Sequence, residues 1–220
     1  MNVTNKASRI LGVAFLLQFA TSFSSGVFLR PLWFVDGDMA QSLLNLAKNP
    51  WLLRVCILLD MLTALGVIFL GATLFFTLRK QNEKMALTAL GFYILEGALL
   101  GASRMAAFTL IGLSQEFVAA GQPADLLLLA KLAFDSMEFV GGTLHMLAFC
   151  FGAILFYFLL YKSGVVPRVL SLWGLITVVP MLVGTVTQIF GYTIPFYFYV
   201  PYVPFELVIG IWVLVKGVKE

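Results

Sequence analysis

The chain has 220 residues, of which 61% are hydrophobic and 11% are charged, and its formal net charge at pH 7 is +3. Soluble domains average about 45–50% apolar and about 25% charged residues, so this composition excludes a soluble globular protein. Long unbroken apolar runs favour membrane-spanning α-helices over a closed barrel. No basic arm for nucleic acid is present. We therefore expect a single all-α domain, residues 1–220, that crosses the membrane several times in contact with lipids.

Six membrane-spanning helices are predicted in chain order. The first follows a basic start, but it is longer than a usual signal-peptide core and no clear A-x-A cleavage site follows it, so we expect it to be retained. The predicted spans cover residues 8–29, 52–78, 85–113, 138–161, 168–190 and 196–215.

Basic residues gather at alternate ends of these spans. Nine of the fourteen Lys and Arg fall on one side, and by the positive-inside rule that side is cytoplasmic. An even number of spans agrees, so both termini are predicted to be cytoplasmic, with the protein in the cell membrane. The nine are Lys6, Arg9, Arg79, Lys80, Lys84, Lys162, Arg168, Lys216 and Lys219.

The two longer outer connections are half apolar and too short to span. Residues 38–49 place several apolar side chains near one helical face, and residues 123–135 open with Pro123 and Asp125, which favour a helix start. Two interpretations stay open: short helices that lie along the outer interface, or packed loops over the helix ends.

Several spans carry strongly polar residues, each of which needs a protein partner or water in the bilayer. Nearly all are predicted at the midplane or toward the outside, which implies a polar cavity that opens outward. The candidate lining residues, for ligand binding or proton coupling, are Asp60, Glu96, Arg104, Glu138, His145, Gln188 and Glu206.

The third span separates two of these charges. Glu96 and Arg104 are about 12 Å apart along a helix and on different faces, so a direct bond between them is not expected. We expect Arg104 to pair with Asp60 or Glu138, and Glu96 to meet Glu206 or a bound ligand. Gly97 and Gly101 form a G-x-x-x-G spacing that allows close helix packing, more typically within a bundle than between copies.

The last span contains Pro195, Pro201 and Pro204 shortly before Glu206. Proline removes a helical hydrogen bond, so we expect a kink or break just before this carboxylate. Such a break either builds a binding site at mid-depth, as in many transporters, or only delays the start of a structural helix.

The sequence contains no catalytic motif and predicts no metal site or cofactor. His145, the only histidine, is read as a hydrogen-bonded core residue or a proton carrier rather than as a metal or haem ligand. The two cysteines, Cys56 and Cys150, lie in apolar runs without metal-ligand spacing, which is typical of buried inert thiols.

Three segments resemble a bacterial family of membrane proteins, the domain of unknown function 4386 family. They are FYILEGALL (92–100), YKSGVVPRVLSLWGL (161–175) and PFELVIGIWVLVKG (204–217). The resemblance implies a multi-span helical protein with one glutamate in the third span, here Glu96, and one in the last, here Glu206. It implies no activity. Tyr93 stands where such proteins often carry an arginine, which leaves Glu96 dependent on other spans.

Three functional hypotheses follow. The first is binding or transport of a small or lipid-like molecule in the outward cavity. The second is a membrane-embedded enzyme acting on lipid head groups or quinones, with Glu138 and His145 as acid and base. The third is a structural or assembly protein whose buried charges fix helix packing. The sequence does not indicate an oligomeric partner.

Overall fold

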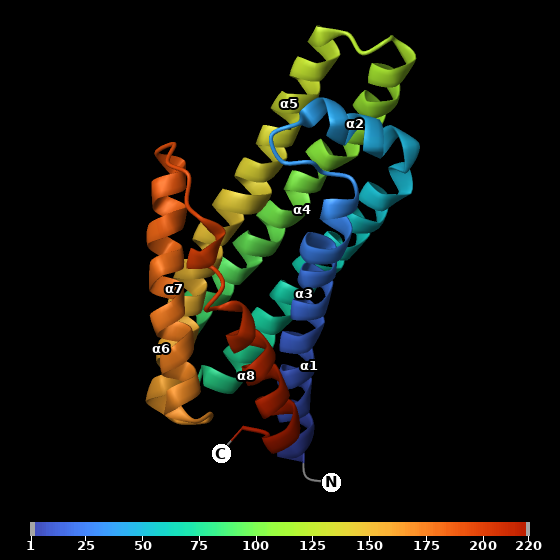
Figure 1. Cartoon of the computed structure of the whole chain (residues 1–220). Coiled ribbons are helices and arrows are strands. Elements are labelled where there is room, and N and C mark those ends of the chain that lie inside the picture. Colours follow the sequence, from blue (N-terminus) through green and yellow to red (C-terminus); the bar gives the residue numbers. More distant parts are fainter. Residues whose placement is uncertain (1–2, 219–220) are drawn as a thin grey trace.

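The computed structural model describes residues 3–218, and their regular structure is helical throughout (Figure 1). Two π-helical segments, η1 and η3, and two 3-10 segments, η2 and η4, interrupt the α-helices. In chain order the elements are α1 (Val3–Phe23), η1 (Ser24–Leu29), η2 (Arg30–Leu32), α2 (Met39–Lys48), α3 (Pro50–Leu78), α4 (Glu83–Ala119), α5 (Ala124–Glu138), η3 (Phe139–Leu144), α6 (His145–Ser163), α7 (Arg168–Ile189), η4 (Phe196–Phe198) and α8 (Val203–Lys216).

Within residues 3–218, five continuous helical stretches are long and apolar enough to cross a membrane. This makes the chain an integral membrane protein. The stretches are Arg9–Leu32, Pro50–Leu78, Glu83–Ala119, Ala124–Ser163 and Arg168–Ile189.

The predicted sixth span, residues 196–215, is only partly helical. Its α-helix, α8, has 14 residues and is about 21 Å long, short of the roughly 30 Å of hydrocarbon. The prolines explain the difference, because Pro195 and Pro201 lie in the irregular stretch and Pro204 falls in the first turn of α8, where proline is tolerated. The break predicted before Glu206 is confirmed, whereas the count of six spans is not.

The two predicted outer helices differ from each other. Residues 39–48 form the separate helix α2, capped by Asp38, whose Oδ1 accepts a hydrogen bond from the Gln41 N–H at 2.9 Å. Residues 123–135 are not a separate interfacial helix, because α5 continues through η3 into α6. Gly141 and Gly142 lie in η3, where a π-helical turn keeps the chain running in one direction instead of turning it back.

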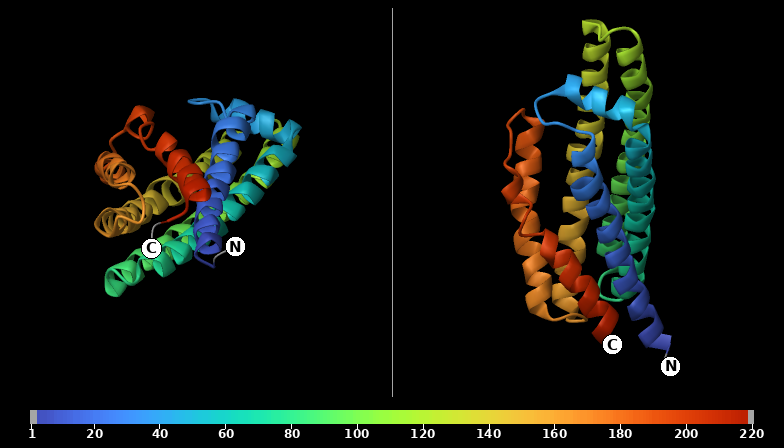
Figure 2. Two further views of the ribbon diagram at one scale, coloured as in Figure 1. Left: turned by 90° about the horizontal axis from the view of Figure 1, so that it is seen from below. Right: turned by 45° about the vertical axis from the view of Figure 1, so that its right-hand side comes forward.

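The helices pack as an elongated bundle (Figures 1 and 2). α4 lies between α3 and α6, α1 packs on α3 and α8, and α7 packs on α6. The α4–α5 hairpin extends past the rest of the bundle at the end opposite the termini, and α2 crosses beside it. The beginning of α1 and the end of α8 lie at the same end of the molecule.

Two apolar clusters occupy the two ends of the bundle. The cluster nearer the termini includes Leu74, Phe156 and Phe205, and the cluster at the other end includes Leu46 and Phe117. Along α3 and α4, the residues between the two clusters carry the polar side chains. The fold therefore places a polar layer between two apolar cores.

Candidate functional site: a polar cavity inside the bundle

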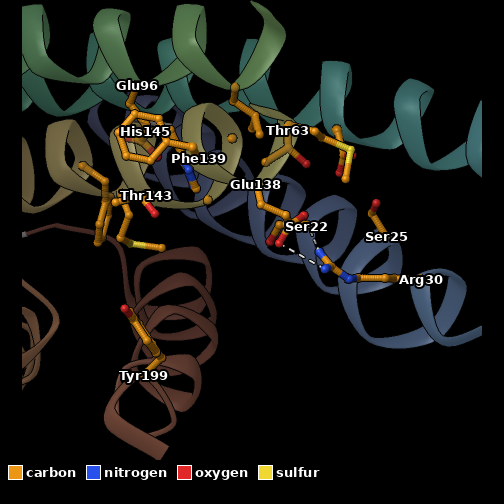
Figure 3. Close-up of a pocket in the computed structure, with 18 of the residues that line it drawn as sticks. Ser22, Ser25, Arg30, Thr63, Glu96, Glu138, Phe139, Thr143, His145 and Tyr199 are labelled. Atoms are coloured by element: carbon orange, nitrogen blue, oxygen red, sulfur yellow. Dashed lines mark hydrogen bonds and ion pairs between the residues drawn. The ribbon is translucent and has the colours of Figure 1, made fainter. Parts of the chain in front are cut away.

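A cavity of about 1320 Å³ occupies this polar layer (Figure 3). α1, η1, α3, α4, η3, α6, α7 and the chain from residue 191 to α8 contribute to its wall. The structure brings all seven polar residues singled out from the sequence to this one cavity, while their role in binding stays a prediction. They are Asp60, Glu96, Arg104, Glu138, His145, Gln188 and Glu206.

Asp60 and Arg104 form a mostly buried ion pair between α3 and α4. The Arg104 Nη1 donates to Asp60 Oδ2 at 2.6 Å, and each side chain is 14% exposed. Nε and Nη2 of Arg104 donate to the Ser103 hydroxyl at 3.0 and 2.8 Å. Gly141 of η3 packs so closely against Ser103 and Arg104 that a Cβ would collide with both. Of the two partners expected for Arg104, Asp60 is the one that it contacts.

The other expected partner, Glu138, binds Arg30 instead. Nη1 and Nη2 of Arg30 donate to the two carboxylate oxygens of Glu138 at 2.9 and 3.0 Å, and Figure 3 shows this pair at the edge of the cavity. The guanidinium also lies over the rings of Phe34 and Phe134, at 4.8 and 5.6 Å from their centroids. Arg30 was not singled out from the sequence.

Glu206 begins a chain of hydroxyl groups at the end of the cavity nearer the termini. The Tyr202 hydroxyl donates to Glu206 Oε1 at 2.9 Å, and the Tyr157 hydroxyl lies 2.5 Å from the Tyr202 oxygen. The single O–H of Tyr202 is used in its hydrogen bond to the carboxyl group, so Tyr157 is the donor in the second bond. Gln18 of α1 lies beside the same carboxyl group. These residues hold one oxygen of Glu206 in place.

Glu96 has no such support. Its side chain is 95% buried, with a residue exposure of 5%, and Oε2 has no hydrogen-bond partner among the described residues. Glu206 is near enough for its charge to act on Glu96. The two cations of the cavity wall, Arg30 and Arg104, are each paired with another carboxylate. Glu96 is therefore a carboxyl group of the cavity wall with a buried, unsatisfied acceptor.

Three further buried polar atoms on the cavity wall have no hydrogen-bond partner in the described part of the chain. They are Gln18 Oε1, Trp33 Nε1 and His145 Nδ1. Together with Glu96 Oε2 they are buried donors and acceptors without a partner in residues that line the cavity. Buried polar groups are satisfied in most proteins, so this group of atoms marks the cavity as the candidate binding site.

The geometry gives little support to the acid–base pair of the enzyme hypothesis. The Glu138 carboxylate is occupied by Arg30, and no described hydrogen bond joins Glu138 to His145. In residues 3–218, no group of three or more His, Cys, Asp or Glu side chains is arranged to hold a metal ion.

The helix-packing prediction for the G-x-x-x-G spacing divides between its two glycines. A Cβ on Gly97 would lie 2.8 Å from the Ala64 carbonyl oxygen, so α3 and α4 approach closely there. At Gly101 the nearest atom is the Met61 sulfur at 3.6 Å, an ordinary contact distance. Gly97 is thus the position at which packing against α3 requires glycine.

The sequence profile of the domain of unknown function 4386 family (DUF4386) matches residues 10–217 of the chain. The chain belongs to this family. Comparison with curated proteins and with solved structures finds no match. Membership in DUF4386 assigns no activity, so a function for the cavity rests on its geometry.

Proposed function

We propose that this DUF4386 protein binds a small or lipid-like molecule in the cavity and carries it within or across the membrane. The observation that supports the proposal is Glu96, a buried carboxyl group on the cavity wall with an oxygen that has no hydrogen-bond partner among the described residues. An unpaired buried polar group costs about 1–3 kcal/mol, and a charged one costs more. A bound molecule that donates a hydrogen bond or brings a positive charge removes this cost.

The ligand would contact Glu96 and Glu206 with a donor or cationic group. Tyr202 donates a hydrogen bond to the Glu206 carboxyl group, so Glu206 is prepared to bind while Glu96 completes the pair. Arg30 and Arg104 have their own carboxylate partners and are less available for an anionic group. The apolar cluster near the termini fills the inner half of the bundle, which corresponds to a state open on the outer side only.

The test is a thermal-shift screen on the full chain in lipid nanodiscs, using amines, lipids and inorganic cations. At least one ligand should stabilise the wild type and lose its effect in Glu96→Gln. Glu116→Gln is the matched control, since Glu116 lies on the same helix and is exposed. If no ligand stabilises the wild type more than Glu96→Gln, the site is structural and the proposal is wrong.

A further inference from the structure

We infer that the ligand is a cationic amphiphile, with an amine that meets Glu96 and Glu206 and an apolar chain that leaves the cavity toward the outer lipid. This inference rests on the proposed function and names its ligand class. It joins three observations: the balance of charge in the cavity, the nature of its wall, and the place where it opens.

The charge balance favours a cation. Five carboxylic acids line the cavity against two arginines, and both arginines form ion pairs with carboxylates. Glu96 and Glu206 have no cationic partner in the described chain. A protonated amine between them would give Glu96 Oε2 its missing donor and would separate the two carboxyl groups, whereas an anionic head group would meet further negative charge.

The cavity wall includes large apolar side chains as well as the polar residues. Its large side chains come from η1, η3, α6, α7 and the segment before α8. They include Val27, Phe139, Met146, Phe149, Met181 and Tyr192. The cavity exceeds the roughly 300–1,000 Å³ of drug-sized sites, so it has room for a long apolar chain as well as a head group. Methionine side chains adapt to chains of different shape.

We place the opening of the cavity between α1–η1 and the segment of residues 190–202. α8 begins only at Val203, so this segment, in which the short 3-10 helix η4 is the only regular element, runs beside α7 (Figure 1) and contributes to the cavity wall. Val27 on one side and Tyr192 on the other both line the cavity and are 46% and 68% exposed. Such residues mark the edge of an opening.

The outer surface of the same segment is aromatic. Phe190, Tyr192 and Tyr197 are 76%, 68% and 67% exposed, and aromatic rings are enriched where a protein meets the lipid head groups. Non-helical backbone at membrane depth is tolerated where it lines a cavity. The segment therefore separates the cavity from lipid, and its free edge is where an apolar chain passes out.

The experiment measures binding of butylamine, octylamine and dodecylamine to the full chain in nanodiscs, with dodecanol and dodecanoate as neutral and anionic matches. Each buried methylene increases the affinity roughly fourfold. The dissociation constant of dodecylamine, expressed as the concentration of free amine in water, should therefore be at least about tenfold lower than that of butylamine. Both Glu96→Gln and Glu206→Gln should weaken dodecylamine binding by at least about tenfold, the loss of one charged hydrogen bond.

A second pair of variants tests the path of the chain. Phe139→Ser, at the cavity wall, should weaken dodecylamine more than butylamine. Phe158→Ser should affect neither, because Phe158 is exposed on α6 and does not line the cavity.

The outcomes separate this inference from the proposed function. If butylamine binds as tightly as dodecylamine and its binding still depends on Glu96, the cavity is a binding site but the inference that its ligand carries an apolar chain is wrong. If dodecanol or dodecanoate matches dodecylamine, the cationic class is wrong. If no amine distinguishes the wild type from Glu96→Gln while another ligand of the screen does, only the proposed function stands.

Discussion

The carboxylates of the cavity wall differ in what surrounds them. Asp60 meets Arg104 directly, Glu138 is held by both nitrogens of Arg30, and Glu206 accepts from Tyr202. Glu96 alone among these four leaves a buried oxygen without a partner in the described structure. Asp60 and Glu138 are explained by the stability that their ion pairs contribute to the fold. Glu96 requires a different explanation, which the proposed ligand provides.

Asp60→Asn should lower the free energy of unfolding by about 3 kcal/mol, because it leaves the guanidinium of Arg104 buried without its counter-charge. The double variant Asp60→Asn, Arg104→Gln should be more stable than the sum of the two single changes by at least about 1 kcal/mol. Reversible unfolding in mixed micelles measures both. Strictly additive effects would show that the pair does not contribute as a unit.

Glu138→Gln is the matched comparison for this ion pair. The side chains of Arg30 and Glu138 are 35% and 38% exposed, so solvent screens their attraction. Glu138→Gln should therefore lower the free energy of unfolding by less than about 1 kcal/mol. A loss as large as that of Asp60→Asn would mean that burial does not set the strength of these pairs.

Close helix packing in the bundle depends on single glycines. Gly97→Ala should lower the free energy of unfolding by about 1–3 kcal/mol, because its Cβ would meet the backbone of α3. Gly101→Ala should leave stability unchanged or raise it by up to about 1 kcal/mol, since alanine favours helix and has space beside Met61. The same unfolding measurement compares them, and equal losses would contradict this account of the helix contact.

The helices themselves follow from long apolar runs, so their existence and order were predictable, but two features of α5–α6 and α8 were not. Periodicity does not distinguish a turn from a π-helical segment. The sequence therefore did not predict that the chain passes through Gly141 and Gly142 without turning. The prolines before α8 indicated a break but not its extent. How much of residues 196–215 is helical depends on tertiary packing around Tyr202 and Trp173, whose Nε1 donates to the Pro201 carbonyl at 3.1 Å.

The polar residues of the cavity were predictable as a group because each is costly in lipid and must find a partner or water. The partners of these polar residues were harder to predict from the sequence. Arg30 lies at the end of the first helical stretch and gave no sign of reaching Glu138. Tyr157 and Tyr202 are aromatic residues that a bilayer tolerates, so nothing in the sequence distinguished them from ordinary core residues until the structure placed their hydroxyls beside Glu206.

At the scale of the whole molecule, two apolar clusters enclose a polar layer, and the cavity in that layer lies toward the end of the bundle opposite the termini. We propose that this end faces the outside, as the distribution of Lys and Arg predicts. The bundle would then hold a ligand at mid-depth and exchange it with the outer surface.

Single cysteines at two exposed positions test this orientation, in a background with Cys56 and Cys150 changed to alanine. A membrane-impermeant maleimide should label Gln115→Cys, near the tip of the α4–α5 hairpin, in intact cells. It should label Gln81→Cys, in the α3–α4 turn, only after the cells are permeabilised. The reverse pattern would place the cavity on the cytoplasmic side.

The most direct test of the central claim is an experimental density map of the protein extracted from its native membrane without added amines. We expect elongated density in the cavity, with one end within hydrogen-bond distance of Glu96 and Glu206 and the other directed toward Val27 and Tyr192. A map in which protein side chains close the cavity and satisfy Glu96 Oε2 would contradict the account.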